Sequence, residues 1–284
     1  MLQFFRKENK TYTESKFECK RDGLTIRGTE FRPQGENLPI AIVSHGFMAN
    51  QDSVKHYAKL FAELGYVAYC FDFNGGCVMN GKSDGKTTEM SVLTEVKDLE
   101  AVMEYAKNCS YTDASRMDLA GGSQGGFVSA LTAAKHPEEI VKLVLLFPAL
   151  CIPDDARAGH MMFAKFDPDN IPDIVNCGPM KLGRCYVADV IGMNPYEEIK
   201  GYPGPVLLIH GTADDLVKCE YSKRAFDTYQ NHNPRKLAKE ERATLYLIEG
   251  GGHGFSSKHD KLAMEEIRRF VMPKKRELEY AEGE

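Results

Sequence analysis

The sequence predicts an α/β protein with a mostly parallel sheet of eight strands and helices on both faces. Short apolar runs alternate with segments of helical spacing from about residue 38 onward. Strands that are apolar on both sides are typical of parallel sheets whose two faces are covered by helices. A second observation is the pattern Gly-x-Ser-x-Gly at residues 121–125, which lies between one of these apolar runs and a helix.

The predicted elements follow one another in a regular order. An antiparallel hairpin comes first, with strands at 16–20 and 24–28 joined through Arg21-Asp22-Gly23. Six buried strands then follow, at 40–43, 66–71, 116–120, 141–146, 206–209 and 244–248. Helical spacing predicts helices at 53–64, 90–106, 258–271 and in the segment after Ser123.

The connection between the sixth and seventh predicted strands contains no clear strand. We expect residues 149–202 to form a lid or cap inserted into a single domain that spans residues 1–284, because a plain loop of this length is uncommon in a compact domain. The alternative is a small helical decoration with a satellite core of its own, and both descriptions can hold together.

Composition excludes several classes of protein. With 284 residues and 43% hydrophobic content the chain can bury a full core, and a net charge of −5 gives no reason to expect a nucleic-acid partner. The 8 cysteines include no Cys-x-x-Cys pair, so they are interpreted as small core residues in a reducing compartment. Without an apolar signal core or a run of membrane-spanning length, the chain is expected to be a soluble, cytoplasmic protein. The composition does not decide the oligomeric state, and a homodimer is one alternative.

Ser123 is the candidate nucleophile. A serine at a turn from strand to helix adopts a strained backbone conformation that projects its hydroxyl above the sheet. Side chains at Gly121 and Gly125 would collide where the strand and the helix cross. A Gly/Ser-rich turn without catalytic meaning is the alternative, and the strand before and the helix after favour the catalytic interpretation.

The chain supplies an acid and a base in the order Ser…Asp…His, as expected for a sheet with this turn. Asp214 and Asp215 follow the strand at 206–209, and His253 follows the last strand. Parallel sheets of this kind place their sites beyond the carboxyl ends of their strands. His253 stands among glycines, where a core histidine is not expected, whereas His210 ends a buried strand and is interpreted as a packed residue.

An oxyanion needs two backbone donors. One is predicted to be the N–H of Gln124, directly after the nucleophile and at the start of its helix. The other is predicted to be the N–H of Phe47, just past the first parallel strand, where Gly46 lets the backbone approach.

The sequence also contains a pattern that is typical of phosphate-binding loops. Residues 76–83 satisfy the P-loop pattern Gly-x-x-x-x-Gly-Lys-Ser. A phosphate cradle requires a helix that begins at the Lys-Ser pair, whereas Asp84-Gly85-Lys86 is a turn sequence. The match is therefore interpreted as a chance one.

Together these motifs resemble the α/β-hydrolase superfamily over almost the whole chain, and more narrowly its bacterial cinnamoyl/feruloyl esterase branch. Besides Ser123, Asp214, His253 and 45–47, the resemblance rests on segments 71–75, 81–85, 122–126, 147–149, 170–173, 182–186 and 210–214. It favours Asp214 over Asp215 as the acid. It also implies that Asp155 and Tyr186 help to bind the aromatic hydroxyl of a hydroxycinnamoyl group.

The resemblance implies a serine carboxylic-ester hydrolase that forms an acyl-enzyme on Ser123, with a small-molecule ester as substrate and with no metal or cofactor. Since the chain lacks tryptophan, aromatic stacking has to come from side chains such as Phe47, Phe163 or Tyr186. The chain departs from the family at the expanded loop 77–80 and at Gly122, where many relatives carry histidine. A short-chain carboxylesterase, a monoacylglycerol lipase, a peptidase of the same chemistry and a non-catalytic binding protein remain as alternatives.

Overall fold

The computed structural model describes residues 11–232, 235 and 237–272. Its main sheet has eight strands in the order β1-β2-β4-β3-β5-β6-β11-β12. Strand β2 runs antiparallel to both of its neighbours, β1 and β4, and every pair from β4 to β12 is parallel. The bounds are β1 Tyr12–Arg21, β2 Leu24–Pro33, β3 Leu38–Ser44, β4 Val67–Asp72, β5 Thr112–Gly122, β6 Ile140–Leu146, β11 Val206–Gly211 and β12 Ala243–Ile248. The predicted α/β fold and its edge hairpin are confirmed.

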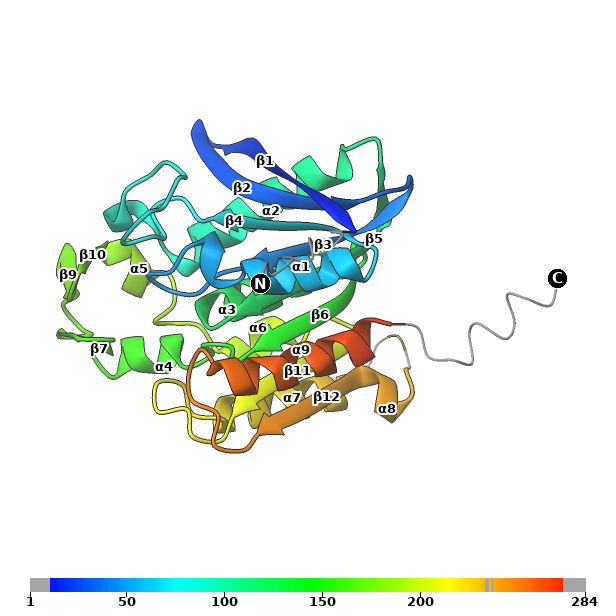
Figure 1. The fold of residues 1–284 in the computed structure, drawn as a ribbon. Helices are drawn as coiled ribbons and strands as arrows, with labels where there is room; N and C mark the ends of the chain where they lie inside the picture. The colour runs from blue at the N-terminus through cyan, green and yellow to red at the C-terminus, as the bar shows by residue number, and fades with distance from the viewer. Residues whose placement is uncertain (1–10, 233–234, 236, 273–284) are drawn as a thin grey trace, which may run out of the picture.

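Helices cover both faces of this sheet (Figure 1). Helices α1 (Lys55–Glu63) and α9 (Ser257–Val271) pack on one face, where Leu60, Phe61 and Ile267 belong to one hydrophobic cluster. Helices α2 (Val92–Lys107), α3 (Gln124–Lys135) and α7 (Glu220–Asn231) pack on the other face, where Leu99 and Phe127 belong to a second cluster.

Helix α7 is an element that the sequence analysis did not predict. Its buried residues are Ser222, Ala225 and Tyr229. Two of these three are small, so the helix offers few large apolar residues from which its buried face can be recognised in the sequence. The short helix α8 (Lys239–Arg242) buries none of its residues and gives no apolar signal either.

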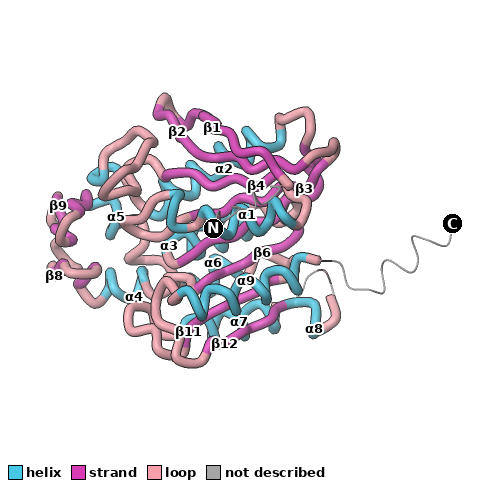
Figure 2. The backbone as a smooth tube through the Cα atoms, in the orientation of Figure 1, coloured by secondary structure: helices cyan, strands magenta, loops and turns pink. Residues whose placement is uncertain are grey.

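The segment between β6 and β11 lies at one end of the sheet, on the left in Figure 1. It contains helices α4 (Ile152–Arg157), α5 (Arg184–Ala188) and α6 (Pro195–Ile199) and the strands β7 (His160–Met161), β8 (Ala164–Lys165), β9 (Ile174–Cys177) and β10 (Met180–Gly183). The strands pair as two short hairpins, with the elements separated by loops (Figure 2). Strands of two or four residues are too short to produce a readable alternation, which is why none was predicted.

This insertion has no satellite core of its own, contrary to the alternative raised from the sequence. Its buried side chains, such as Val175, Leu182 and Val187, belong to the same cluster as α2 and α3. The second half of the insertion is also hydrogen-bonded to the start of α2, because Ser91 Oγ donates to Asp189 Oδ2 at 2.5 Å. Thr87, in the short 3-10 helix η2 (Thr87–Glu89), donates to the carbonyl oxygen of Lys181 at 2.5 Å. No helix in the described part of the chain is long and apolar enough to span a membrane.

Candidate active site

Ser123 lies at the sharp turn from β5 to α3. Its backbone has φ +55° and ψ −122°, a left-handed conformation that L residues rarely adopt. A Cβ at Gly121 would lie 2.2 Å from the carbonyl oxygen of Gly125, and a Cβ at Gly125 would lie 2.3 Å from that of His45. Both distances are far below van der Waals contact, so the steric prediction for these glycines is confirmed.

The structure brings Ser123, His253 and Asp214 together. His253 Nε2 lies 3.0 Å from Ser123 Oγ, and His253 Nδ1 lies 2.8 Å from Asp214 Oδ2. Because a carboxylate only accepts, Nδ1 donates to Asp214 and Nε2 is left to accept the serine proton. The ring of Phe147 contacts the imidazole edge-to-face, with centroids 4.8 Å apart.

Asp214 is held as a buried anion. Its Oδ1 accepts the backbone N–H groups of Leu216 and Val217, each at 2.9 Å. Burial alone would raise the pKa of Asp214, but hydrogen bonds from His210, His253 and the Val217 N–H outweigh it and hold the pKa well below its ordinary value. The carboxylate is therefore ionised at any pH at which an imidazole can act as a base.

The neighbouring candidates lie in other surroundings. His210 is fully buried, with Nδ1 2.7 Å from Ser222 Oγ and Nε2 2.8 Å from the carbonyl oxygen of Val217. This agrees with its interpretation as a packed residue, and it also supports the anion, since Nε2 lies 3.2 Å from Asp214 Oδ2. Asp215 instead points into solvent and pairs with Lys218 at 2.9 Å.

The two loops that carry the acid and the base touch through their main chains. A Cβ at Gly211, the last residue of β11, would lie 2.0 Å from the carbonyl oxygen of Gly251. Ala213 N–H donates to that same oxygen at 2.9 Å. The position of His253 relative to Asp214 is thus fixed by backbone contact between neighbouring strand ends.

The two predicted oxyanion donors flank Ser123. Gln124 is the first residue of α3, where the N–H groups of the first turn point along the helix axis. On the other side the Gly46 backbone lies against Ser123, since a Cβ at Gly46 would be 3.0 Å from Ser123 Cβ and 3.5 Å from Oγ. Phe47 follows directly in the chain, so both N–H groups belong to segments that contact the nucleophile.

The side chain of Gln124 is the centre of a buried hydrogen-bond chain that the sequence analysis did not predict. Its Nε2 donates to Glu95 Oε2 at 2.7 Å, and its Oε1 accepts the hydroxyl proton of Tyr186. Burial raises the pKa of Glu95 well above its ordinary value. Tyr186 belongs to α5 and Glu95 to α2, so this chain joins the insertion, the nucleophile helix and α2 directly beneath the site.

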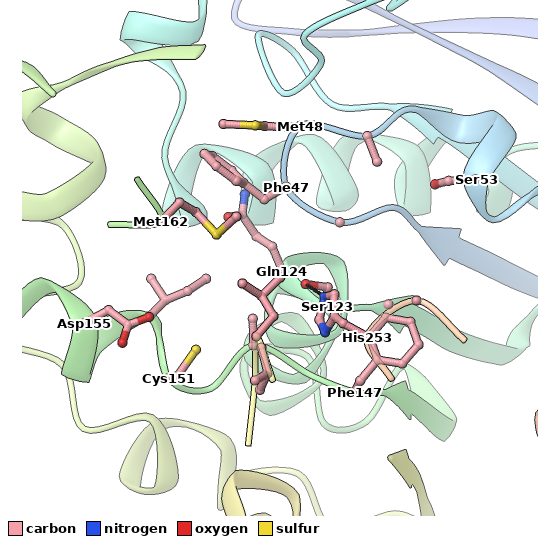
Figure 3. A pocket seen from close by; sticks show the side chains of 18 of the residues that line it. Phe47, Met48, Ser53, Ser123, Gln124, Phe147, Cys151, Asp155, Met162 and His253 are labelled. Carbon is pink, nitrogen blue, oxygen red and sulfur yellow. Dashed lines mark hydrogen bonds between the residues drawn. The ribbon is translucent and has the colours of Figure 1, made fainter. Parts of the chain in front are cut away.

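A cavity of about 390 Å³ opens above these groups (Figure 3). Its walls are largely apolar, with Met48, Phe147, Ile152 and Met161 among them, and Ser123 and His253 reach into it. Mostly apolar cavities of this size with a few convergent polar groups are typical of small-molecule sites.

The predicted substrate residues divide into two sets. Phe47, Asp155 and Tyr186 line the cavity, and Asp155 lies on the insertion side of Ser123 in Figure 3. Phe163 does not line it, contrary to the prediction. It stands in the two-residue turn between β7 and β8, where its side chain is 73% exposed and its ring lies beside Gly178. Met161 and Met162, its neighbours in the chain, reach the cavity instead.

His45, Asp72 and Cys77 have the composition of a metal site, with one ligand atom each within 4.8 Å of one another. The ligand atoms of Asp72 and His45 accept backbone N–H groups. Asp72 Oδ1 accepts Gln51 N–H at 2.7 Å and Oδ2 accepts Lys82 N–H at 2.8 Å. His45 Nε2 accepts Phe73 N–H at 3.2 Å. The cluster therefore ties the segment around Phe47 to the end of β4 and to the backbone just after the expanded loop.

The P-loop match at residues 76–83 forms no phosphate cradle. No helix begins at Lys82–Ser83, and the hydroxyl of Ser83 donates to the carbonyl oxygen of Asp72 at 2.5 Å. The interpretation as a chance match is confirmed.

An eight-stranded, mostly parallel sheet with a strained serine at a strand-to-helix turn defines an α/β hydrolase. The family model described as serine aminopeptidase, S33, matches residues 35–176, half of the chain. The chain belongs to this family of hydrolases. Within it the chain is of the serine-esterase type and resembles the cinnamoyl esterases.

Individual relatives agree with this assignment. Est1E from Butyrivibrio proteoclasticus, solved with ferulic acid bound, is similar with a TM-score of 0.80 and 28% identity over 90% of this chain and 97% of that one. A monoacylglycerol lipase from Mycolicibacterium smegmatis is 22% identical over 277 residues, 88% of this chain and 94% of the lipase. The Pyrococcus furiosus esterase Pf2001, with 20% identity and a TM-score of 0.67 over 92% of each chain, shares the fold.

Proposed function

We propose that this protein hydrolyses carboxylic esters through an acyl-enzyme on Ser123 and that its preferred acyl group is a hydroxycinnamoyl group. The observation that carries the chemistry is the relay from Asp214 through His253 to Ser123, at 2.8 Å and 3.0 Å, which faces a largely apolar cavity. The similarity to Est1E with bound ferulic acid supports the choice of acyl group.

The reaction follows from this geometry. His253 Nε2 takes the proton of Ser123 as the serine oxygen attacks the ester carbonyl, and the N–H groups of Phe47 and Gln124 receive the negative charge on the carbonyl oxygen. The protonated imidazole, stabilised by Asp214, then gives its proton to the departing alcohol. Water attacks the acyl-enzyme in the second half by the same proton route.

The insertion side of the cavity supports an aromatic acyl group. Phe47 and Tyr186 lie with ring centroids 5.6 Å apart, and both line the cavity. Asp155 lines it further along, and burial raises the pKa of its carboxyl above the ordinary value. A carboxylate at that place accepts the hydrogen bond of a phenolic hydroxyl. We further propose that residues 149–202 act as a lid over the single hydrolase domain and carry this specificity.

The test compares methyl ferulate and methyl cinnamate with p-nitrophenyl butyrate, using the wild-type protein and Ser123→Ala. We expect hydrolysis of the ferulate at a higher kcat/KM than the cinnamate, which lacks the phenolic hydroxyl, and loss of all activities in Ser123→Ala. Hydrolysis of the butyrate alone would keep the esterase and reject the hydroxycinnamoyl preference. Activity that survives in Ser123→Ala would reject Ser123 as the nucleophile.

A second candidate is a monoacylglycerol lipase, which the similarity to the Mycolicibacterium smegmatis lipase supports. Met162 and Leu216 line the cavity although they are 38% and 49% exposed, so its rim is apolar where an aliphatic chain would enter. A series of p-nitrophenyl esters separates the two functions. A lipase gains kcat/KM steadily with chain length beyond eight carbons, whereas an aryl-acyl pocket of about this volume is expected to lose it.

A further inference from the structure

The cavity is also lined by residues from the start of α1 and the turn before it, and three of these residues carry polar atoms. The three are Ser53, His56 and Tyr57, and the proposed reaction uses none of them. In Figure 3, Ser53 lies on one side of Ser123, and Asp155, Cys151 and Met162 lie on the other. An ester whose carbonyl carbon is at Ser123 and whose acyl group extends toward Asp155 therefore directs its alcohol toward Ser53 and His56.

The hydrogen bonding of His56 is set by its partner on α9. His56 Nε2 lies 3.2 Å from Asp260 Oδ1, and the hydroxyl of Tyr57 donates to the same oxygen. Burial would raise the pKa of Asp260, but these hydrogen bonds outweigh it, so the carboxylate is ionised and can only accept. Nε2 thus carries a proton, and when the ring holds only that one proton its Nδ1 atom is an acceptor.

This second nitrogen is available to a ligand. No residue in the described part of the chain bonds to His56 Nδ1, and the side chain is 40% exposed at the cavity wall. Ser53 offers a second acceptor of the same kind, because its hydroxyl donates to the carbonyl oxygen of Asn50 at 2.8 Å and keeps its lone pairs free. Two acceptors on residues that line the same cavity match a ligand with hydroxyl donors.

We propose that Ser53 and His56 form a subsite for the leaving alcohol, and that it selects alcohols with further hydroxyl groups over alkyl alcohols of the same length. Asp260 is a positioning residue for this subsite, since it engages Nε2 of His56 and leaves Nδ1 for a ligand. The inference rests on the proposed ester hydrolysis at Ser123 and is independent of the acyl group.

The experiment uses pairs of esters that share an acyl group and a three-carbon alcohol. Propyl and 1-glyceryl esters are compared for butyrate and for ferulate, because glycerol differs from propanol only by two hydroxyl groups. In each acyl series that the enzyme accepts, the glyceryl ester is expected to have the higher kcat/KM, by about tenfold for two hydrogen bonds.

Two substitutions at one position separate binding from structural support. Asn carries its polar atoms at the δ position, like His Nδ1, whereas Gln carries them at the ε position that faces Asp260. His56→Asn is expected to keep part of the glyceryl preference, and His56→Gln and Ser53→Ala are expected to lose most of it. His232→Gln, at an exposed histidine after α7, is the control and should keep the full preference.

A measurement on the wild-type protein does not depend on how these variants fold. Free glycerol and propan-1-ol compete with water for the acyl-enzyme. The acceptor oxygen bonds to the acyl carbon as the bond to Ser123 Oγ breaks, and the acceptor proton passes through His253 to Ser123. Since the acceptor occupies the place of the leaving alcohol, glycerol is expected to capture several-fold more acyl groups than propan-1-ol at equal concentration.

Each outcome has a distinct meaning. Equal kcat/KM for propyl and glyceryl esters, or a preference that survives both His56→Gln and Ser53→Ala, overturns the subsite and leaves the esterase intact. Hydrolysis of the butyrates without the ferulates overturns the hydroxycinnamoyl preference and leaves the subsite testable in the butyrate pair. Hydrolysis of none of the four esters overturns both proposals.

Discussion

The hydroxyl of Tyr186 donates its proton to the side-chain carbonyl oxygen of Gln124, the residue directly after Ser123. A tyrosine of the insertion is therefore bonded to the first residue of the helix that carries a proposed oxyanion donor. The resemblance to cinnamoyl esterases implies that this hydroxyl contacts a substrate phenol. In this structure the hydroxyl proton of Tyr186 is used in the hydrogen bond to Gln124. The hydroxyl oxygen and the ring of Tyr186 are what remains for a substrate to contact.

Tyr186→Phe is accordingly expected to lower kcat for every ester and not for hydroxycinnamates alone. The substitution leaves the buried Gln124 oxygen without a donor, which costs about 1–3 kcal/mol, and it loosens the start of α3. We expect kcat to fall about tenfold for methyl ferulate, methyl cinnamate and p-nitrophenyl butyrate alike.

Asp155→Asn is the comparison for that variant. It should reduce kcat/KM for methyl ferulate and leave methyl cinnamate and p-nitrophenyl butyrate nearly unchanged, because only the ferulate presents a phenolic donor. A Tyr186→Phe protein that loses ferulate activity alone would show instead that Tyr186 acts on the phenol.

Asp214→Asn is expected to reduce kcat by up to about four orders of magnitude. The amide cannot stabilise the imidazolium that forms on His253, and it favours the wrong tautomer of that ring. Asp215→Asn provides a matched control in the same loop, since Asp215 is exposed and pairs only with Lys218. Steady-state kinetics on p-nitrophenyl butyrate measures both variants, and comparable losses in the two would contradict the assignment of Asp214.

Gly125→Ala and Gly122→Ala lie three residues apart, one on each side of Ser123, and are expected to differ sharply in stability. A Cβ at Gly125 meets two carbonyl oxygens at 2.3 and 2.5 Å, whereas a Cβ at Gly122 meets only the ring of Phe147, at 3.5 Å. Chemical denaturation should show a loss of about 3 kcal/mol or more for Gly125→Ala and a change within about 1 kcal/mol for Gly122→Ala. Similar stabilities for the two would mean that α3 can move away from the end of β3, whose carbonyl oxygens at Ser44 and His45 lie against Gly125.

Asp118 in β5 predicts an unusual dependence of stability on pH. Burial raises its pKa to about 6 from an ordinary 3.8, although the Lys142 N–H donates to Oδ1 at 3.1 Å. Because the folded-state pKa is the higher one, ionisation opposes folding, and the protein loses stability as the pH rises from about 4 to about 6. Asp118→Asn should therefore raise the free energy of unfolding by about 3 kcal/mol at pH 8 and make no difference near pH 4.

Asp113→Asn tests a pKa shift of the opposite sign, on the same strand as Asp118. Hydrogen bonds from Ser115 and Arg116 lower the pKa of Asp113 to about 2, so its ionised form favours the fold above pH 4. Asp113→Asn should therefore not raise the free energy of unfolding at pH 8. Urea denaturation of the three proteins at pH 4, 6 and 8 makes the comparison, and a flat difference between Asp118→Asn and the wild type would contradict the raised pKa.

The parallel sheet and the three residues of the relay could be predicted because their signals are local. Ser123 and His253 each stand among glycines at the end of an apolar strand, and that combination marks a turn above a sheet. The choice between Asp214 and Asp215 could not be made from the residues themselves. It depends on the loop, in which the N–H groups of Leu216 and Val217 turn the Asp214 carboxylate inward.

Other parts of the site depend on contacts that the sequence does not display. Glu95 stands on the buried face of α2, and this was a readable signal, but its partner Gln124 is 29 residues away. His56 is fixed by Asp260 across 204 residues. Phe163 was assigned to the substrate because it is aromatic, whereas the two-residue turn that exposes it has no periodic signature.

The close approach of Gly211 to Gly251 has an evolutionary consequence. The distance between the acid and the base is set by backbone contacts of glycines at the ends of two neighbouring strands. Substitutions of the surrounding side chains therefore change this distance little. Most residues that shape the acyl side of the cavity belong to the connection between β6 and β11, and those of the alcohol side belong to the start of α1. The catalytic geometry and the proposed substrate specificity thus depend on separate segments of the chain. Substitutions in one segment can change which esters are bound while the geometry between acid and base stays the same.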